Sequence, residues 1–275
     1  MKAKSLLLSL VLFFLIGTSI GQNVLDGVFV KEHYPTRKVI PYTHLREADV
    51  MWSKRIWRKM DLREKINHPL YFPTEKIKDR RSLSQVVFDA VNEGSLTAYA
   101  PTDDEFTTVM TKAQIDGIMS RTDTIYTEDL DNPGNMVMKI SKNEINFGDI
   151  HEYRIKEDWF FDKQKSILDV RIIGLQPIIA LEKDGEIRPT PLFWIYYPEA
   201  RSIFANAEVF NRANDAERKT LEDIFWKRMF GSYIYKEQNV YERRIADYAQ
   251  GLDALLEAEK IKDDIFKLEH DLWEY

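Results

Sequence analysis

The chain has 275 residues, of which 31% are charged, and a formal net charge of −6 at pH 7. It contains no cysteine, which excludes disulfides and thiolate metal sites, and also the modified cysteine of a bacterial lipoprotein. No basic cluster indicates nucleic-acid binding, and beyond the N-terminus no apolar run is long enough to predict a membrane span. A mildly acidic globular protein of one domain or two is expected.

The N-terminus has the pattern of a secretory signal peptide. Two lysines precede an apolar run over residues 6–16, which is shorter than the roughly 20 residues that a transmembrane helix needs. Small residues at the end of segment 1–21 predict cleavage between Gly21 and Gln22. The sequence therefore predicts an exported protein, and removal of the signal peptide would leave a net charge of −8.

The next segment, residues 22–44, is predicted to be an extended arm. It contains two prolines and shows no sustained hydrophobic periodicity. Such an arm is either a simple flexible leader or a segment that docks on a partner.

A helix that carries two tryptophans is predicted after the arm. Apolar residues recur at helical spacing from Arg46 to Ile66, and Pro69 would end the helix. Trp52 and Trp57 lie here among basic residues, which could indicate a face for nucleic acid or anionic lipid. Tryptophans turned toward a core or a protein partner are favoured, so both are candidate interface residues.

Cap and turn signals dominate the following stretch. The sequence from Ser82 to Gln85 is a capping box, which predicts a short helix with Gly94 at its end. A short strand is predicted over residues 97–100, followed by an acidic cluster within residues 101–105. Calcium or magnesium would need further oxygen ligands from elsewhere, so turn and cap chemistry is the favoured interpretation of this cluster.

Residues 154–197 are predicted to be the core of a sheet, because strand-like runs follow one another there without a helix. Apolar side chains alternate from Tyr153 to Phe161, and the alternation resumes after a polar break, which predicts a hairpin. Residues 192–197 are apolar at successive positions, as in a central strand that is covered on both faces.

Residues 122–127 and 136–140 flank a turn-rich sequence and predict a second hairpin that extends the sheet at its periphery. The elements together predict an α+β fold, in which a mainly antiparallel sheet of about five to six strands packs against helices. Residues 45–275 would form a single domain of this kind, after the signal peptide 1–21 and the arm 22–44.

The C-terminal part, from about residue 206 to 275, is predicted to be helical. Asn214 would open one helix, and a longer helical pattern runs from Gln238 to about Trp273. The apolar spacing of the longer pattern slips by one residue near Ala258, so its two halves are expected to break apart or to pack against different neighbours. This segment either closes the domain or protrudes between subunits; its candidate interface residues are Tyr248, Leu252 and Leu255.

The sequence offers no set of residues typical of catalysis. The five histidines have no metal-ligand spacing, and there is no GxSxG elbow and no phosphate-binding glycine loop. Acidic pairs carry no information, because a chain with 45 acidic residues forms such pairs by chance. We therefore expect no enzymatic activity, no cofactor and no metal.

Several long motifs resemble one family, the GldN (PorN) family of Bacteroidetes, a core component of the type IX secretion system. The motifs are HLREADVMWSKRIWRKMDLREKINHPLYFP, DDEFTT, RIKEDWFFDKQ, VRIIGLQP, PLFWIYYPEAR, NAEVFNRANDAERKTLEDIFWKRMFGSYI and GLDALLEAEKIKDDIFKLEHDLW. The resemblance runs from about Leu45 to the C-terminus.

The resemblance implies a non-enzymatic structural subunit for protein secretion and gliding motility. Such a protein would lie in the periplasm, held at the inner face of the outer membrane by a lipoprotein partner (GldK or PorK). Copies of the chain would form a ring-like complex with that partner and contact the periplasmic part of the motor protein (GldM or PorM). A periplasmic module that binds peptidoglycan or peptide is the alternative.

Overall fold

The computed structural model describes residues 37–273, apart from 78–79, 129–135, 184–185 and 215. The predicted signal peptide lies outside these residues, and so does its cleavage site between Gly21 and Gln22. Only the last part of the predicted arm, residues 37–44, is described.

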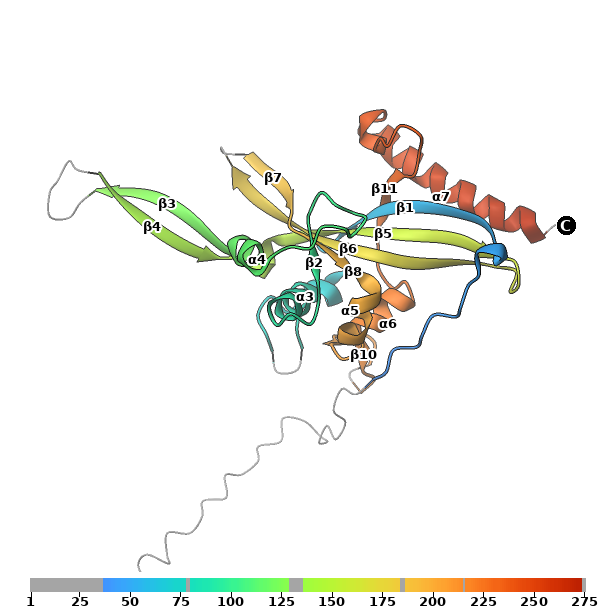
Figure 1. Ribbon diagram of the computed structural model, residues 1–275, viewed down its shortest axis with the longest axis horizontal. Helices are drawn as coiled ribbons and strands as arrows, with labels where there is room; N and C mark the ends of the chain where they lie inside the picture. The colour runs from blue at the N-terminus through green and yellow to red at the C-terminus, as the bar shows by residue number, and fades with distance from the viewer. Residues whose placement is uncertain (1–36, 78–79, 129–135, 184–185, 215, 274–275) are drawn as a thin grey trace, which may run out of the picture. The chain divides into compact units, whose positions relative to one another are not determined.

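An antiparallel sheet forms the centre of the described chain (Figure 1). Its strand order is β11-β1-β5-β6-β8-β2, and β7 pairs with a further part of β6. The strands are β1 (Val50–Asp61), β2 (Ala98–Tyr99), β5 (Ile150–Asp162), β6 (Ile167–Lys183), β7 (Glu186–Pro191), β8 (Trp194–Tyr196) and β11 (Tyr233–Glu237). Together with the helices, this sheet confirms the predicted α+β class.

The predicted sheet core is confirmed. Strands β5 and β6 form the expected hairpin and pair along their length, from Ile150 opposite Ile179 to Asp162 opposite Ile167. Strand β8 lies between β6 and β2, and the apolar residues around it, Phe193 to Ile195, are buried. A position inside the sheet explains why this run is apolar at successive positions.

The predicted helix over Arg46 to Ile66 is wrong, because this segment forms the long strand β1. The buried residues Ile56 and Met60 and the partly buried Trp52 recur every four residues, a spacing that fits both a helix and one face of a strand. Pairing decides between the two, since β1 is hydrogen-bonded to β5 on one edge and to β11 on the other.

A large hydrophobic cluster joins the sheet to five short helices. These are α2 (His68–Tyr71), α3 (Leu83–Asn92), α4 (Lys112–Met119), α5 (Tyr197–Phe204) and α6 (Leu221–Trp226). The capping box that starts α3 is confirmed: the Ser82 hydroxyl accepts from the Gln85 N–H, and the Gln85 side chain accepts from the Ser82 N–H. Gly94, just beyond the helix, has φ +73°, as a C-terminal stop requires.

The second predicted hairpin exists but does not extend the main sheet. Helix α4 (Lys112–Met119) leads into β3 (Ser120–Glu128), which pairs only with β4 (Met136–Glu144). Nine residue pairs join the two strands, and neither pairs with a strand of the main sheet. A further two-stranded sheet contains β9 (Glu208–Val209) and β10 (Lys219–Thr220).

The prediction of a helical C-terminal part is wrong for much of its length. Helix α6 begins at Leu221 and not near Asn214, because the side chain of Thr220 caps it by accepting from the Asp223 N–H. Strand β11 then joins the sheet, and the short 3-10 helix Ile245–Asp247 precedes α7 (Leu252–Trp273). Two further 3-10 turns, Glu47–Asp49 and Phe147–Asp149, precede β1 and β5.

The described part of the arm lies against its own domain. The Tyr42 ring stacks on Trp226 with centroids 5.6 Å apart, and the Arg201 guanidinium lies 4.1 Å from the Tyr42 centroid. Arg201 also donates to the Ile40 carbonyl at 2.9 Å, and Arg171 donates to the Thr43 carbonyl at 2.7 Å. Residues 37–44 are thus held to the domain by backbone and side-chain contacts.

In the described part of the chain, no helix combines the length and the apolar character that crossing a bilayer demands. Helix α7 is the longest at 22 residues, but charged side chains recur along it.

Candidate protein-docking surface

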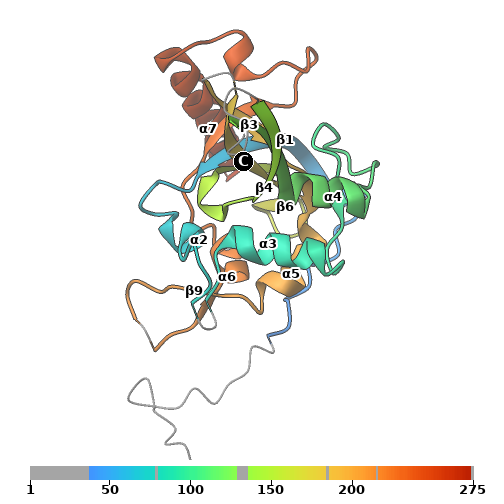
Figure 2. The ribbon, with the colours of Figure 1, turned by 90° about the vertical axis from the view of Figure 1, so that its left-hand side faces the viewer.

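Helix α7 lies beside β1 and β11, apart from the other helices (Figures 1 and 2). It is seated on a second hydrophobic cluster, whose buried residues are Ile56, Ile234, Ile245, Ala258, Ile261 and Ile265. The helix contributes Ala258, Ile261 and Ile265, spaced three and four residues apart on one face. The predicted slip near Ala258 therefore marks the residue at which the buried stripe of α7 begins.

A second face of α7 is apolar and exposed. Leu252, Leu255 and Leu256 have exposed fractions of 70%, 54% and 59%, and they are spaced three and four residues apart. At 100° per residue Leu252 and Leu256 lie on the side of the helix opposite to Ile261 and Ile265, and Leu255 lies at the edge of that side. A helix that only closes a domain is expected to be polar on that side.

Two tyrosines continue this surface into the segment before α7. The Arg243 guanidinium lies 4.8 Å from the Tyr241 ring centroid and 4.6 Å from that of Tyr248, so it bridges both rings. The pKa of Tyr248 is raised by burial and by the carboxylates of Glu257 and Glu237. We name the exposed residues Tyr241, Tyr248, Leu252, Leu255 and Leu256 the α7 patch.

The two candidate tryptophans do not share a face of β1, because they are five residues apart on one strand. Trp52 packs against the second cluster, under α7, and is partly buried. Trp57 is 5% exposed, and its indole N–H donates to the Asp104 carboxylate at 2.9 Å. Its ring lies 4.4 Å from the Lys236 amine, and the chain's own residues thus cover it.

The structure therefore separates the predicted interface residues into two groups. Tyr248, Leu252 and Leu255 reach one exposed surface, whereas Trp52 and Trp57 contact their own chain. Sequence reasoning missed Leu256, although it lies one helical turn after Leu252 and that spacing could have found it. Phe266 was missed as well; it is exposed and lies three turns beyond Leu255 on the same face.

The acidic cluster before β3 is built as a turn. The Asp103 carboxylate accepts hydrogen bonds from the N–H groups of Glu105, Thr107 and Thr108 and from the Thr107 hydroxyl. These bonds, that of the hydroxyl first, lower the pKa of Asp103 well below its ordinary value. The favoured cap and turn interpretation is thus confirmed for Asp103, while Asp104 bonds to Trp57.

Two further tyrosines with raised pKa values lie in the core. Burial raises the pKa of Tyr153, whose hydroxyl pairs with that of Ser84 at 2.9 Å. Burial and the neighbouring Glu222 raise the pKa of Tyr197. Among the described residues, no three His, Asp or Glu side chains are arranged to hold a metal ion.

The exposed apolar face of α7 on this α+β domain is a feature typical of surfaces at which proteins contact other proteins. The family model "Gliding motility associated protein GldN" matches residues 45–274. The chain therefore belongs to the GldN family, a structural component of gliding motility and type IX secretion and not a known enzyme family. A comparison with curated proteins found no match.

Proposed function

We propose that this protein is a non-enzymatic, periplasmic subunit of the type IX secretion machinery that docks on a partner protein through the α7 patch. The observation that carries the proposal is the second apolar face of α7. Leu252, Leu255 and Leu256 are more than half exposed, although the same helix already buries a full stripe against the sheet. Protein interfaces combine such an apolar centre with aromatic and arginine side chains, which Tyr248 and Arg243 supply at the edge.

The family membership supports a finer form of the proposal. The partner is an outer-membrane lipoprotein of the GldK or PorK kind, and repeated contacts between copies of this chain and that lipoprotein build a ring. A contact with the periplasmic part of the GldM or PorM motor completes the assembly. The signal pattern of residues 1–21 supports export, and a lipoprotein partner would hold the protein at the outer membrane.

The test is co-expression with the lipoprotein partner, followed by affinity capture and size-exclusion chromatography. A variant with Leu252→Ser, Leu255→Ser and Leu256→Ser is expected to lose co-elution while it keeps the melting temperature of the isolated domain. The matched control is Arg81→Ser with Asp89→Ser, which removes a partly exposed ion pair at α3, away from α7, without changing the net charge.

Co-elution of the triple variant at the wild-type level would show that the α7 patch is not the docking surface. If the wild-type chain also remains alone in the presence of the lipoprotein, the assembly itself is wrong. Electron microscopy of the co-eluting fraction then distinguishes a ring from a simple heterodimer.

A further inference from the structure

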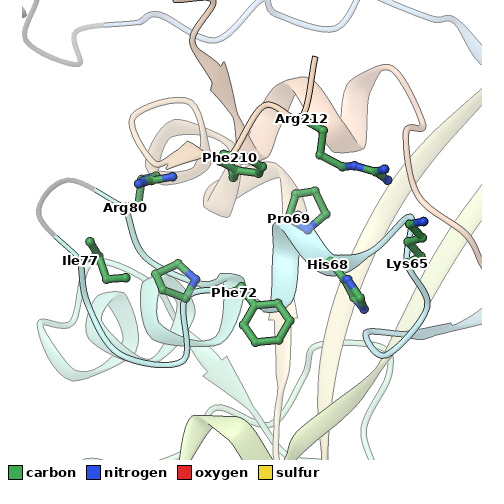
Figure 3. Close-up of a pocket in the computed structure, with 9 residues that line it drawn as sticks. Lys65, His68, Pro69, Phe72, Ile77, Arg80, Phe210 and Arg212 are labelled. Carbon is green, nitrogen blue, oxygen red and sulfur yellow. The ribbon is translucent and has the colours of Figure 1, made fainter. Parts of the chain in front are cut away.

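A pocket of about 420 Å³ lies away from the α7 patch, between the segment around α2 and the segment after β9 (Figure 3). Its apolar lining consists of prolines and large side chains, chiefly Pro69, Phe72, Ile77 and Phe210. Phe72, Ile77 and Phe210 are each about half exposed in the isolated chain. A pocket of this size accommodates one or two amino-acid side chains with their backbone.

Hydrogen bonds to backbone groups hold the chain segments that form the walls of the pocket. The fully buried Asn67, at the start of α2, donates to the carbonyls of Asp61 and Gly231 and accepts from the Gly231 N–H. Ile77 and Arg80 exchange N–H to carbonyl bonds of 3.2 and 2.9 Å. The pocket is therefore preformed, which reduces the entropy lost when a ligand binds.

The charge of the lining is positive. Lys65, Arg80 and Arg212 line the pocket from three separate chain segments, and no described lining residue is acidic. Lys65 and Arg212 form no ion pair within the described part of the chain, while the Arg80 guanidinium lies 5.6 Å from the Phe210 ring centroid. The acidic Glu208 on β9 is already paired with Arg218 at 3.1 Å.

This charge is opposite to that of the whole molecule, which is −6. Cations gathered around exposed aromatic side chains suit a ligand that is both anionic and apolar. The cations can pair with its charges, and the aromatic side chains can cover its apolar part. The three cations come from different positions in the protein. They therefore match several carboxylates spaced along a peptide better than they match one compact anion.

We propose that the pocket binds an acidic peptide segment of a partner protein. An aromatic or large aliphatic side chain of that segment inserts between Phe72 and Phe210, and flanking carboxylates pair with Lys65, Arg80 and Arg212. The inference does not depend on the α7 patch, because the two surfaces share no residue.

The test uses the mature full chain and two short synthetic peptides with blocked ends. Both contain a central tryptophan; it is flanked by aspartate and glutamate in one peptide and by lysine and arginine in the other. Isothermal titration calorimetry is expected to show at least tenfold tighter binding of the acidic peptide. Arg80→Glu with Arg212→Glu should weaken this binding at least tenfold, and Phe210→Ala should weaken it with the charges intact.

The matched control is Lys260→Glu with Lys267→Glu, which makes the same change in net charge on exposed positions of α7. It should leave acidic-peptide binding unchanged. Because the side chains of Arg80 and Arg212 are exposed, their variants are expected to fold, which thermal melts verify.

Three outcomes would overturn the proposal. Equal affinity for the two peptides would show that charge does not select the ligand. Absence of saturable binding up to about 1 mM would leave the pocket without useful affinity for a peptide segment. Binding of benzoate as tightly as the acidic peptide would assign the pocket to small apolar anions instead.

Discussion

A single carboxylate, that of Glu157, lies between the two hydrophobic clusters of the protein. It is fully buried and accepts two bonds from the Arg228 guanidinium, at 3.0 and 3.1 Å, and one from the Trp159 indole at 3.1 Å. Its neighbours on the same face of β5 are Ile155 in the large cluster and Trp159 against the second cluster. The ion pair between Glu157 and Arg228 thus lies where the two hydrophobic clusters meet.

Replacement of Glu157 by Ala should lower the free energy of unfolding by about 3 kcal/mol, because it leaves the Arg228 guanidinium without its buried partner. Urea denaturation followed by circular dichroism measures the change. Glu259→Ala removes an exposed partner of Lys262 and should change stability by about 0.5 kcal/mol or less. Similar losses in the two variants would contradict the role given to burial.

Asp103 gives a prediction for pH. Its pKa is lowered in the folded chain, so its contribution to stability is present above the unfolded value of about 4 and is lost as the pH falls toward the folded value. Asp103→Asn should therefore melt at a lower temperature than the wild type at pH 7. The gap should narrow progressively below about pH 4, and a gap that stays constant from pH 7 to pH 2.5 would refute this account.

For single residues, the sequence predicts interactions between partners that are close along the chain, but not interactions between partners that are far apart along it. The capping box at Ser82 and the turn at Asp103 involve partners within five residues, so their spacing alone reveals them. Trp57 meets Asp104 and the amines of Lys156 and Lys236, and only the folded sheet brings these together. The sequence could predict that the Trp57 indole is covered, but it could not predict which residues cover it.

Among the elements, α7 is attached by the smaller of the two clusters. Three of its residues are buried there, whereas the large cluster joins the sheet to five helices. Local opening has a lower free energy where fewer apolar contacts must be broken. Helix α7 should therefore open without unfolding the sheet.

Ile261→Ala should make this opening easier by about 2 kcal/mol, since it removes a buried aliphatic side chain from the centre of the seat. Hydrogen exchange measured by mass spectrometry should show faster exchange in peptides of α7 and unchanged protection in β5 and β6. Lys262→Ala, at the next and exposed position, is the control. A uniform loss of protection over all elements would mean that α7 belongs to the same cooperative unit as the sheet.

Strand β1 shows why an element can be misjudged from its sequence. Residues four apart lie on one side of both a helix and a strand, so Trp52, Ile56 and Met60 do not discriminate between them. The decisive information is the pairing with β5 and β11, and β11 is about 175 residues away along the chain. The hairpin of β5 and β6 was predictable because its two strands are adjacent in sequence.

For the molecule as a whole, residues 37–44 of the arm lie over α5 and α6, and we call this segment the strap. Tyr42 covers Trp226 on α6, and Arg201 on α5 contacts both Tyr42 and the Ile40 carbonyl. Arg201 is itself buried and paired with Glu222 at 2.7 Å. Loss of the strap would expose this ion pair and the Trp226 ring to water.

A mature chain that begins at residue 45 should therefore melt at a lower temperature than one that begins at residue 37. The shorter deletion keeps every contact of Tyr42 and Ile40 described above, so it serves as the control. Differential scanning calorimetry measures both. Equal melting temperatures would show that the strap contributes nothing to the stability of the domain.

The fold class could be predicted at this scale, but the strand order could not. Alternating runs and caps define the α+β class from local sequence. The place of β11 beside β1, and the separation of the β3–β4 hairpin from the main sheet, depend on long-range pairing that no local pattern encodes. Leu252 and Leu255 of α7 were found because a helix face can be calculated from spacing alone, although Leu256 was missed.

The pairing of β1 with β11 has a consequence for the order of events during synthesis. The bond between the side chains of Arg58 and Ser232 joins positions 174 residues apart. One edge of β1 must therefore wait until most of the chain has left the ribosome, and Ile56 stays uncovered until Ile261 and Ile265 arrive. The edge of β1 that pairs with β11 is therefore the last part of the main sheet to gain its backbone partners.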